Sequence, residues 1–481
     1  MNIRLTAAGA ALAACTTICA GNGTASLATD SISHNDSIHR ESSLGEVSVV
    51  ARRAGTTRMG GAVNGFNLNR EELFRAACCN LGESFTTNPA VDVSYNDATT
   101  GARQIKLLGL AGTYVQMMTE NMPNFRGAAA PYALGYVPGP WMKGIQVSKG
   151  AASVKNGYEA ITGQINVDYK KPEDEEGIEV NLFGDTKSRI EANADANLHI
   201  NKQLSTEVLM HYENSFENHD DNGDGFYDKP KVEQYNLQNR WLWAGEKYIF
   251  HGGIGALKEH RNGGQTGHRG NDGAELFRIG LDTEWYEAYM KHAFIIDRHK
   301  GTNIALMASG SMHMLDAGYG HKTYDVNEKN VYASLVFETN LTKMHNLSAG
   351  LSLNHDYLGQ TVRMVNDKEA SPVRMNEKET VPGIYAQYTF NLDHRLTAMA
   401  GIRADHSSVY GTFVTPRLHL KYMPTDILTL RLSAGKGYRT PHALAENNYL
   451  LASGRRLVID DLEQEEAWNY GASAALNIPL L

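Results

Sequence analysis

Cysteine and long apolar segments are both scarce in this chain of 481 residues. No stretch reaches the ~18 consecutive apolar residues that a membrane-spanning helix needs, so a helical membrane protein is excluded. The four cysteines stand at positions 15, 19, 78 and 79, and a disulfide between the adjacent Cys78 and Cys79 is geometrically awkward. The fold must therefore be stabilised by other means than disulfides, and a large sheet is one of them.

Basic residues are also in the minority. Lys and Arg total 45 against 54 Asp and Glu, which gives a formal net charge of −9 and argues against a nucleic-acid-binding surface. The mean hydropathy of −0.39 is compatible with a membrane β-barrel, because strands that alternate apolar and polar residues average out as hydrophilic. The 46 Gly and 23 Tyr suit turns, close strand packing and aromatic belts. The composition favours β structure.

Strict alternation of apolar and polar residues is the clearest physical signal. From Ile190 to Ile200 every even position is apolar and every odd position is polar. A tilted strand needs ~9–11 residues to cross a bilayer, which this segment supplies. The same pattern returns at 234–243, 347–354, 396–403, 414–422 and 428–433. A half-buried soluble sheet also alternates, but the polar faces here carry charges and amides, which suit a water-filled lumen.

The connections between these segments differ in length in a regular way. Short ones at 201–203, 245–247, 342–346 and 424–426 alternate with long Gly/Asp/Asn-rich segments at 216–230, 260–273, 316–329 and 358–380. Short turns at one end and long loops at the other are typical of a bacterial outer-membrane barrel. The pattern predicts about 15 strands between 178 and 478. The regular alternation of up and down strands breaks at 274–302.

The N-terminus has the features of a secretory signal at residues 1–28. Arg4 supplies the positive charge, and the segment from Leu5 to Ala14 is a short apolar core. An alternative is a lipobox at 12–15, which would acylate Cys15. Residues 29–45 are polar and rich in Ser, and we expect them to be flexible.

Several motifs downstream resemble one family, the TonB-dependent outer-membrane receptors. Glu46, Val47, Ser48, Val49, Val50 and Ala51 resemble the family's TonB box. The segments 81–93 and 145–172 are similar to its plug domain, and 437–441 with 463–470 resembles a barrel segment. Two departures are Leu108-Gly109 in place of the usual Arg-Gly, and Glu120-Asn121 in place of Asp-Gly.

The resemblance covers residues 46–481 and implies a fold. It implies an N-terminal α/β plug with the TonB box at 46–172 and an antiparallel transmembrane β-barrel at 173–481, in the bacterial outer membrane. About 15 strands are fewer than the ~22 of a plugged transporter. We therefore expect a C-terminally truncated barrel that, as written, does not transport.

The resemblance also implies a function, which is the uptake of a scarce metal chelate of the ferric siderophore, haem or cobalamin type. The partners would be outer-membrane lipid, the small chelate and a periplasmic TonB-type energy-coupling protein that extends residues 46–51 as an added strand. A simpler interpretation of 46–51 is the first strand of the plug. No enzyme activity, required cofactor or nucleic-acid partner is implied. A passive porin or adhesin is the alternative, and a hydrolase is disfavoured because no Gly-x-Ser-x-Gly motif is present.

The candidate substrate-binding residues lie in a Gly/Ala/Pro-rich part of the plug. They are Asn124, Phe125, Arg126, Tyr132 and Tyr136. Arg126 could bind an anionic chelate, and the aromatic rings could stack on a planar ligand. Packing of the plug against the barrel wall is an equally good interpretation. Met117, Met118, Met122 and the Met312-His313-Met314 segment suggest soft-metal ligands, but alternation points His313 away from its neighbours.

An acidic segment in the first long loop resembles a calcium-binding loop. Asp220, Asn222, Asp224 and Asp228 occupy positions 1, 3, 5 and 9 of that motif, with Gly225 at position 6. Position 12 is Lys231 instead of Glu, so the motif is incomplete. The alternatives are a structural calcium ion in an extracellular loop and a solvated acidic turn.

Overall fold

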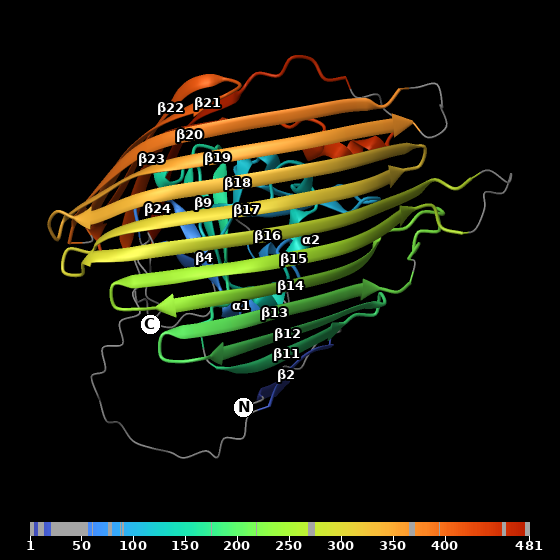
Figure 1. The fold of residues 1–481 in the computed structure, drawn as a ribbon, viewed down its shortest axis with the longest axis horizontal. Helices are drawn as coiled ribbons and strands as arrows, with labels where there is room; N and C mark the ends of the chain where they lie inside the picture. The colour runs from blue at the N-terminus through green and yellow to red at the C-terminus, as the bar shows by residue number, and fades with distance from the viewer. Residues whose placement is uncertain are drawn as a thin grey trace.

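The computed structural model describes most of the chain (Figure 1). The described residues are 4–7, 14–20, 56–59, 61–75, 79–86, 88, 91–174, 176–217, 219–267, 275–364, 371–393, 395–454 and 458–476. The predicted flexible segment 29–45 and TonB box 46–51 lie outside them. None of the helices in these ranges is long and apolar enough to cross a membrane.

One large antiparallel sheet forms the wall of the molecule. Its strands follow chain order after the first two, in the sequence β1-β2-β11-β12 and so on to β24. The wall strands that follow the plug are β11 (Gly177–Gly184), β12 (Arg189–His199), β13 (Leu204–Ser215), β14 (Lys231–Ala244), β15 (Tyr248–Gly264), β16 (Arg278–Asp297), β17 (Thr302–Tyr319), β18 (Lys322–Asn340), β19 (His345–Met364), β20 (Val373–Leu392), β21 (Leu396–Ser407), β22 (Gly411–Thr425), β23 (Leu428–Arg439) and β24 (Glu465–Leu476). These 14 strands, β11–β24, compare with the prediction of about 15, and the predicted antiparallel membrane sheet is confirmed.

Two short strands precede the plug in sequence and extend this sheet. β1 (Arg4–Ala7) pairs with β2 (Ala14–Ala20), and β2 pairs with β11 through Ile18 and Val180. Figure 1 shows β2 beside β11 at one edge of the wall. Both strands fall in the range predicted as a secretory signal, and that assignment stays a prediction.

Alternation along each strand separates an apolar outer face from a polar inner face. On β14, Leu237 is 52% exposed on the outside, whereas Arg240 is fully buried on the inside with 0% exposed. On β12, Ile190 is exposed and its neighbour Glu191 is buried. The sequence pattern therefore predicted the direction of these side chains correctly, because successive residues of a strand point to opposite faces.

The prediction of a long loop at 316–329 is wrong. These residues belong to β17 and β18, which are joined by a two-residue turn at 320–321. The polarity of the outer face changes along these strands: Asp325, Asn327 and Lys329 face outward at one end of β18, and Val331, Leu335 and Phe337 follow. The polar residues that face outward at this end of the strands therefore resembled a loop in the sequence. The expected loops at 260–273 and 358–380 are also shorter, because β15 continues to Gly264, β19 to Met364, and β20 begins at Val373.

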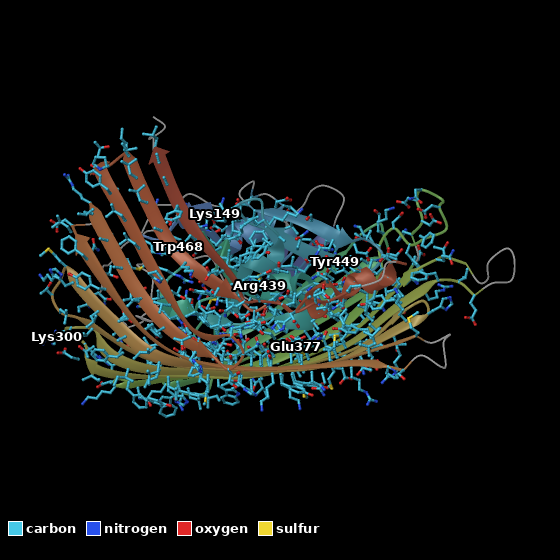
Figure 2. The ribbon with its side chains drawn as sticks, turned by 90° about the horizontal axis from the view of Figure 1, so that it is seen from above. Lys149, Lys300, Glu377, Arg439, Tyr449 and Trp468 are labelled. Carbon is cyan, nitrogen blue, oxygen red and sulfur yellow. The ribbon has the colours of Figure 1, made fainter. Side chains whose placement is uncertain are left out.

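The N-terminal domain lies on the concave face of the wall, and we call it the plug. Figure 2 shows the wall strands curving around it. Its main sheet has the order β3-β4-β9-β10-β7-β8, and β5 and β6 form a separate hairpin. The elements are β3 (Thr56–Arg58), β4 (Gly65–Asn69), α1 (Arg70–Arg75), η1 (Glu83–Phe85), β5 (Asp92–Asp97), β6 (Ala102–Lys106), η2 (Gly112–Tyr114), β7 (Val115–Thr119), β8 (Met122–Pro123), η3 (Gly127–Ala129), α2 (Ala133–Tyr136), η4 (Gly139–Trp141), β9 (Met142–Lys149), η5 (Val154–Asn156) and β10 (Gly163–Tyr169).

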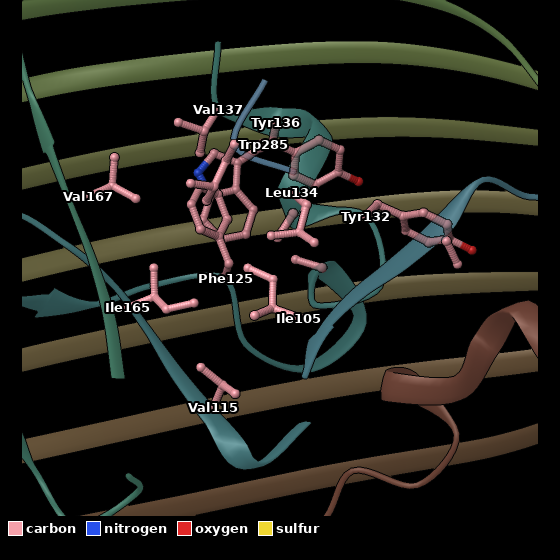
Figure 3. Close-up of a cluster of buried hydrophobic side chains, with 14 of the residues drawn as sticks. Ile105, Val115, Phe125, Tyr132, Leu134, Tyr136, Val137, Ile165, Val167 and Trp285 are labelled. Atoms are coloured by element: carbon pink, nitrogen blue, oxygen red, sulfur yellow. The ribbon is translucent and has the colours of Figure 1, made fainter. Parts of the chain in front are cut away.

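The largest hydrophobic cluster joins the plug to the wall. Ile105, Ile165 and Val167 supply its plug side, and Trp285 of β16 supplies part of its wall side. The Phe125 ring lies between them, with its centroid 5.3 Å from the Trp285 ring (Figure 3). Burial of apolar area therefore fixes the plug within the wall.

Candidate functional site

The two ends of the wall differ in their connections. At one end the turns are short, such as 200–203, 245–247 and 341–344. At the other end are the long connections 216–230, 265–277 and 440–464, the last of which carries the 3-10 helix η6 (Ala445–Ala452). In outer-membrane barrels the long loops are extracellular. We call this end the outer end.

A recess with a volume of about 370 Å³ lies at the outer end. Three parts of the plug and wall form it: the tip of the β5–β6 hairpin of the plug, the β13–β14 and β15–β16 loops of the wall, and η6. Its lining includes Asp97, Thr99, Phe226, Phe277, Tyr449 and Ser453. A ligand here would contact the plug and the wall loops together.

Hydrogen bonds from the wall and within the loops hold the parts of this recess in place. The Arg261 side chain of β15 donates to the carbonyl oxygens of Thr100 and Gly101 at the hairpin tip, at 3.1 and 3.3 Å. The loop that carries Phe226 is tied to the end of β15, because the amide of Thr266 donates to the carbonyl oxygen of Gly225 at 2.7 Å. The recess is therefore built into the fold.

Asn448 of η6 connects three parts of the molecule. Its side-chain oxygen accepts hydrogen bonds from the hydroxyls of Tyr132 in the plug and Tyr319 in the wall, at 2.7 and 3.3 Å. Its amide nitrogen donates to the carbonyl oxygens of Ala445 and Ala128, at 2.8 and 3.4 Å. Asn448 is fully buried, with 0% exposed, so these bonds set the position of η6 over the plug.

The predicted ligand residues Asn124, Phe125 and Arg126 lie deeper, between the plug and the wall. Asn124 donates to Glu287 at 3.1 Å, and Arg126 forms ion pairs with Glu159 at 2.6 Å and Asp356 at 3.1 Å. A small cavity of about 40 Å³ adjoins all three. The Asn124 amide and the terminal guanidinium nitrogens of Arg126 therefore contact the protein itself, whereas the buried Arg126 Nε has no hydrogen-bond partner among the described residues.

The predicted residues Tyr132 and Tyr136 are also buried, at 2% and 3% exposed. The Tyr136 hydroxyl donates to Thr283 of the wall at 3.4 Å. Neither ring lines the recess, and Asn124, Phe125 and Arg126 do not line it either. The assignment of all five as ligand residues stays a prediction.

Sequence reasoning missed the residues that do line the recess. Asp97, Phe226, Phe277 and Tyr449 come from four separate segments. A local signal exists for some of them, since Phe226 follows the Gly-rich acidic turn and Tyr449 lies in the long connection before β24. Their proximity depends on strand register, which the sequence alone does not supply.

A buried charge cluster fixes the turn between β7 and β8 to the wall. Glu120 and Asn121 have positive φ of 53° and 63°, so the Asn in place of the family's Gly suits this left-handed turn. Glu120 pairs with Arg240 at 2.6 Å and Lys291 at 3.2 Å. Burial opposes its ionisation, but the positive charges of Arg240 and Lys291 hold the pKa of Glu120 well below its usual range.

The candidate soft-metal residues do not converge. His313 is fully buried, and its Nδ1 lies 3.4 Å from Glu328, whereas Met312 and Met314 lie on the opposite face of β17. Over the described ranges, no group of three or more His, Cys, Asp or Glu side chains is arranged to hold a metal ion.

The candidate calcium segment forms a compact turn. Asp220 accepts hydrogen bonds from the amides of Asp224 and Gly225 at 3.0 and 2.9 Å. Asp228 accepts one from the amide of Asp221 at 2.8 Å, and Asn222 donates to Asp224 at 3.0 Å. The four predicted residues therefore belong to one turn, with their oxygens largely engaged by backbone amides.

A strand-built wall with an apolar outer face and a folded plug inside it defines the class of plugged outer-membrane β-barrels. The family model described as TonB dependent receptor-like, beta-barrel matches residues 211–477, which is more than half of the chain. The chain belongs to this family, and it is a bacterial outer-membrane protein. A comparison with curated proteins finds no match.

Several solved structures share this fold. The siderophore receptor PirA from Acinetobacter baumannii is 17% identical with a TM-score of 0.59, and the match covers 78% of this chain and 61% of PirA. A mutant of the ferric enterobactin receptor PfeA from Pseudomonas aeruginosa is 15% identical with a TM-score of 0.56, over 76% of this chain and 60% of PfeA. The copper transporter OprC is 13% identical with a TM-score of 0.67, over 89% of this chain and 70% of OprC. The chain thus spans less than two thirds of the length of PirA and PfeA.

Proposed function

We propose that the whole protein to which this chain belongs acts in the active import of a scarce metal chelate of the ferric siderophore, haem or cobalamin type. The observation that carries this proposal is the folded plug on the concave face of the wall, fixed there by the buried Glu120, Arg240 and Lys291 cluster. A passive pore has no use for a domain that obstructs its own path. The similarity to proteins described as siderophore receptors and a copper transporter supports this class of cargo.

The proposed energy source is a periplasmic TonB-type protein that binds Glu46–Ala51. An extended segment of this kind offers backbone groups that a partner can pair with as an added strand. The next described element, β3, pairs only with β4 at the edge of the plug sheet. A pull on residues 46–51 would therefore act directly on the edge of the plug.

Replacing Val49 by Pro tests this proposal. Proline removes a backbone N–H and blocks strand addition, so we expect energised uptake to be lost while ligand binding to whole cells persists. Growth under separate iron, haem and cobalamin starvation would be measured, and the condition that Val49→Pro impairs identifies the cargo. Ser37→Pro, in the preceding polar segment, is the matched control. A Val49→Pro strain that accumulates the substrate normally would indicate a passive pore.

We also propose that the 220–228 turn binds calcium. The proposal is supported by the oxygen ligands at positions 1, 3, 5 and 9 of the motif, and by the hydrogen bonds from the amides of residues 224 and 225 to Asp220, which hold them in one compact turn. Isothermal titration of the purified chain with calcium should give a binding signal that Asp224→Ala abolishes. The absence of a signal in the wild-type chain would identify a solvated acidic turn instead.

A further inference from the structure

The recess at the outer end combines aromatic rings with a carboxylate. Three aromatic residues, Phe226, Phe277 and Tyr449, line it together with the carboxylate of Asp97. Within the described part of the chain, no lysine, arginine or histidine lines it. An aromatic face attracts a cation through its quadrupole, and a carboxylate attracts it by charge.

Two described cations near the recess, Arg261 and Lys322, are engaged elsewhere. Arg261 pairs with Glu259 at 2.9 Å and donates to carbonyl oxygens of the hairpin. Lys322 donates to the carbonyl oxygens of Leu451 and Ser453 at 3.2 and 2.8 Å, which fastens the end of η6. These groups hold the walls of the recess, so neither neutralises Asp97 by a direct pair.

The Asp97 carboxylate is held in place by one hydrogen bond and can accept others. One of its oxygens accepts a hydrogen bond from the amide of Thr100 at 2.7 Å, and its second oxygen has no hydrogen bond to any described residue. Burial and the negative charge of Asp97 raise the pKa of Tyr449, which agrees with the two side chains sharing one recess. The described lining of the recess is thus partly aromatic and carries one carboxylate with an oxygen available to a ligand.

We infer that this recess selects a small cation or a cationic chelate over neutral and anionic ligands of the same size. The inference rests on the proposed function, since it names the charge class of the cargo that the importer would capture first. A volume of about 370 Å³ admits a compact organic cation or a metal ion with one or two flat heterocyclic ligands.

The test for charge uses two probes of nearly the same shape, choline and its neutral isostere 3,3-dimethylbutan-1-ol. Saturation-transfer NMR on the purified full chain in detergent, with empty micelles as the blank, measures both affinities. We expect choline to bind roughly three- to thirty-fold more tightly, and Asp97→Asn and Tyr449→Leu each to reduce that preference. Asp426→Asn, in the exposed turn at the opposite end, should leave it unchanged. Equal affinities, no binding of choline, or a preference that both recess variants retain would overturn the inference.

A second pair of probes extends the test to metal chelates. Copper(II) 2,2′-bipyridine is a flat dication, and the copper(II) bis(pyridine-2,6-dicarboxylate) complex is a dianion. Calorimetric titration should give binding of the dication that Asp97→Asn weakens, and tighter binding of the dianion would contradict the inference. These equilibrium measurements need no energy source, whereas the Val49→Pro uptake assay does. Failure of the charge preference and failure of the importer proposal are therefore separate results.

Discussion

The guanidinium of Arg240 is fully buried, and its partners come from both the plug and the wall. It contacts Glu120 of the plug, donates to the Tyr289 hydroxyl at 2.8 Å, and also donates to the carbonyl oxygen of Lys170. A buried charge is tolerated only when it is paired and hydrogen-bonded. Arg240 therefore depends on the plug being in place.

Removing the Glu120 side chain should therefore lower the stability of the folded chain. Glu120→Ala leaves Arg240 and Lys291 without their shared carboxylate, and we expect a loss of about 3–5 kcal/mol in the free energy of unfolding. Chemical denaturation followed by tryptophan fluorescence at neutral pH measures the change. Lys258→Ala is the control, because its pair with Glu284 is exposed and should contribute at most ~1 kcal/mol. Equal effects of the two variants would mean that the buried cluster does not anchor the plug.

His442 makes the attachment of η6 sensitive to alkaline pH. Burial disfavours the charged ring, but the 2.7 Å contact with Glu377 and the charge of Glu446 outweigh it and raise the pKa of His442 to about 9. A raised pKa means that this stabilisation is fully present below the unfolded value near 6.5 and is lost as pH rises through about 9.

The thermal midpoint of the wild-type chain should therefore fall between pH 7 and pH 10 by more than that of His442→Gln. Calorimetry across this range compares the two, and His406→Gln, at an exposed histidine of β21, serves as the control. Parallel curves for wild type and His442→Gln would show that the pair contributes nothing to folding.

At the scale of elements, the sequence predicted most strands and failed where the surroundings of a strand change along its length. Alternation identified the faces of β12 and β14 correctly, because the exposed face stays apolar and the buried face stays polar along these strands. On β17 and β18 the outward residues pass from apolar to charged, so Asp316 and Asp325 resembled a loop. The local sequence at those residues does not distinguish a solvent-exposed strand from a turn.

Glycines in the wall let the plug approach closely. A Cβ added to Gly401 of β21 would lie 2.6 Å from a methyl group of Val154 in η5. Gly401→Ala should therefore destabilise the chain by about 1–3 kcal/mol through overpacking, measured by chemical denaturation. Gly318→Ala is the matched control, since a Cβ there meets nothing within 4 Å. An unchanged stability for Gly401→Ala would mean that the plug shifts freely at this point.

At the scale of the whole molecule, large apolar side chains are exposed along the outer face of the wall, and we propose that lipid covers them. Leu351 lies within β19, in the half nearest the short turns, and is 52% exposed. Leu341 lies in the short turn that precedes β19 and is 58% exposed. Leu351→Arg should cost ~2–4 kcal/mol of stability in a bilayer, and Leu341→Arg ~0–1 kcal/mol, because the cost of a charge depends on its depth. Folding titrations into lipid vesicles measure both. A similar cost for the two variants would contradict this placement of the bilayer.

The candidate site also depends on the whole molecule. The plug motifs located Asn124, Phe125 and Arg126 correctly within the plug, but the recess combines Asp97 with residues of distant loops. Only the register of the wall and the docking of the plug bring these segments together. Short sequence motifs alone therefore do not predict such a site.

The strands β16 to β20 contain 18 to 20 residues each, about twice the ~9–11 that a bilayer requires. The extracellular surface formed by β16 to β20 therefore consists largely of hydrogen-bonded strands. An antibody raised against the folded protein would recognise a conformational epitope formed across neighbouring strands, and a synthetic peptide of residues 312–330 would be a poor substitute for it.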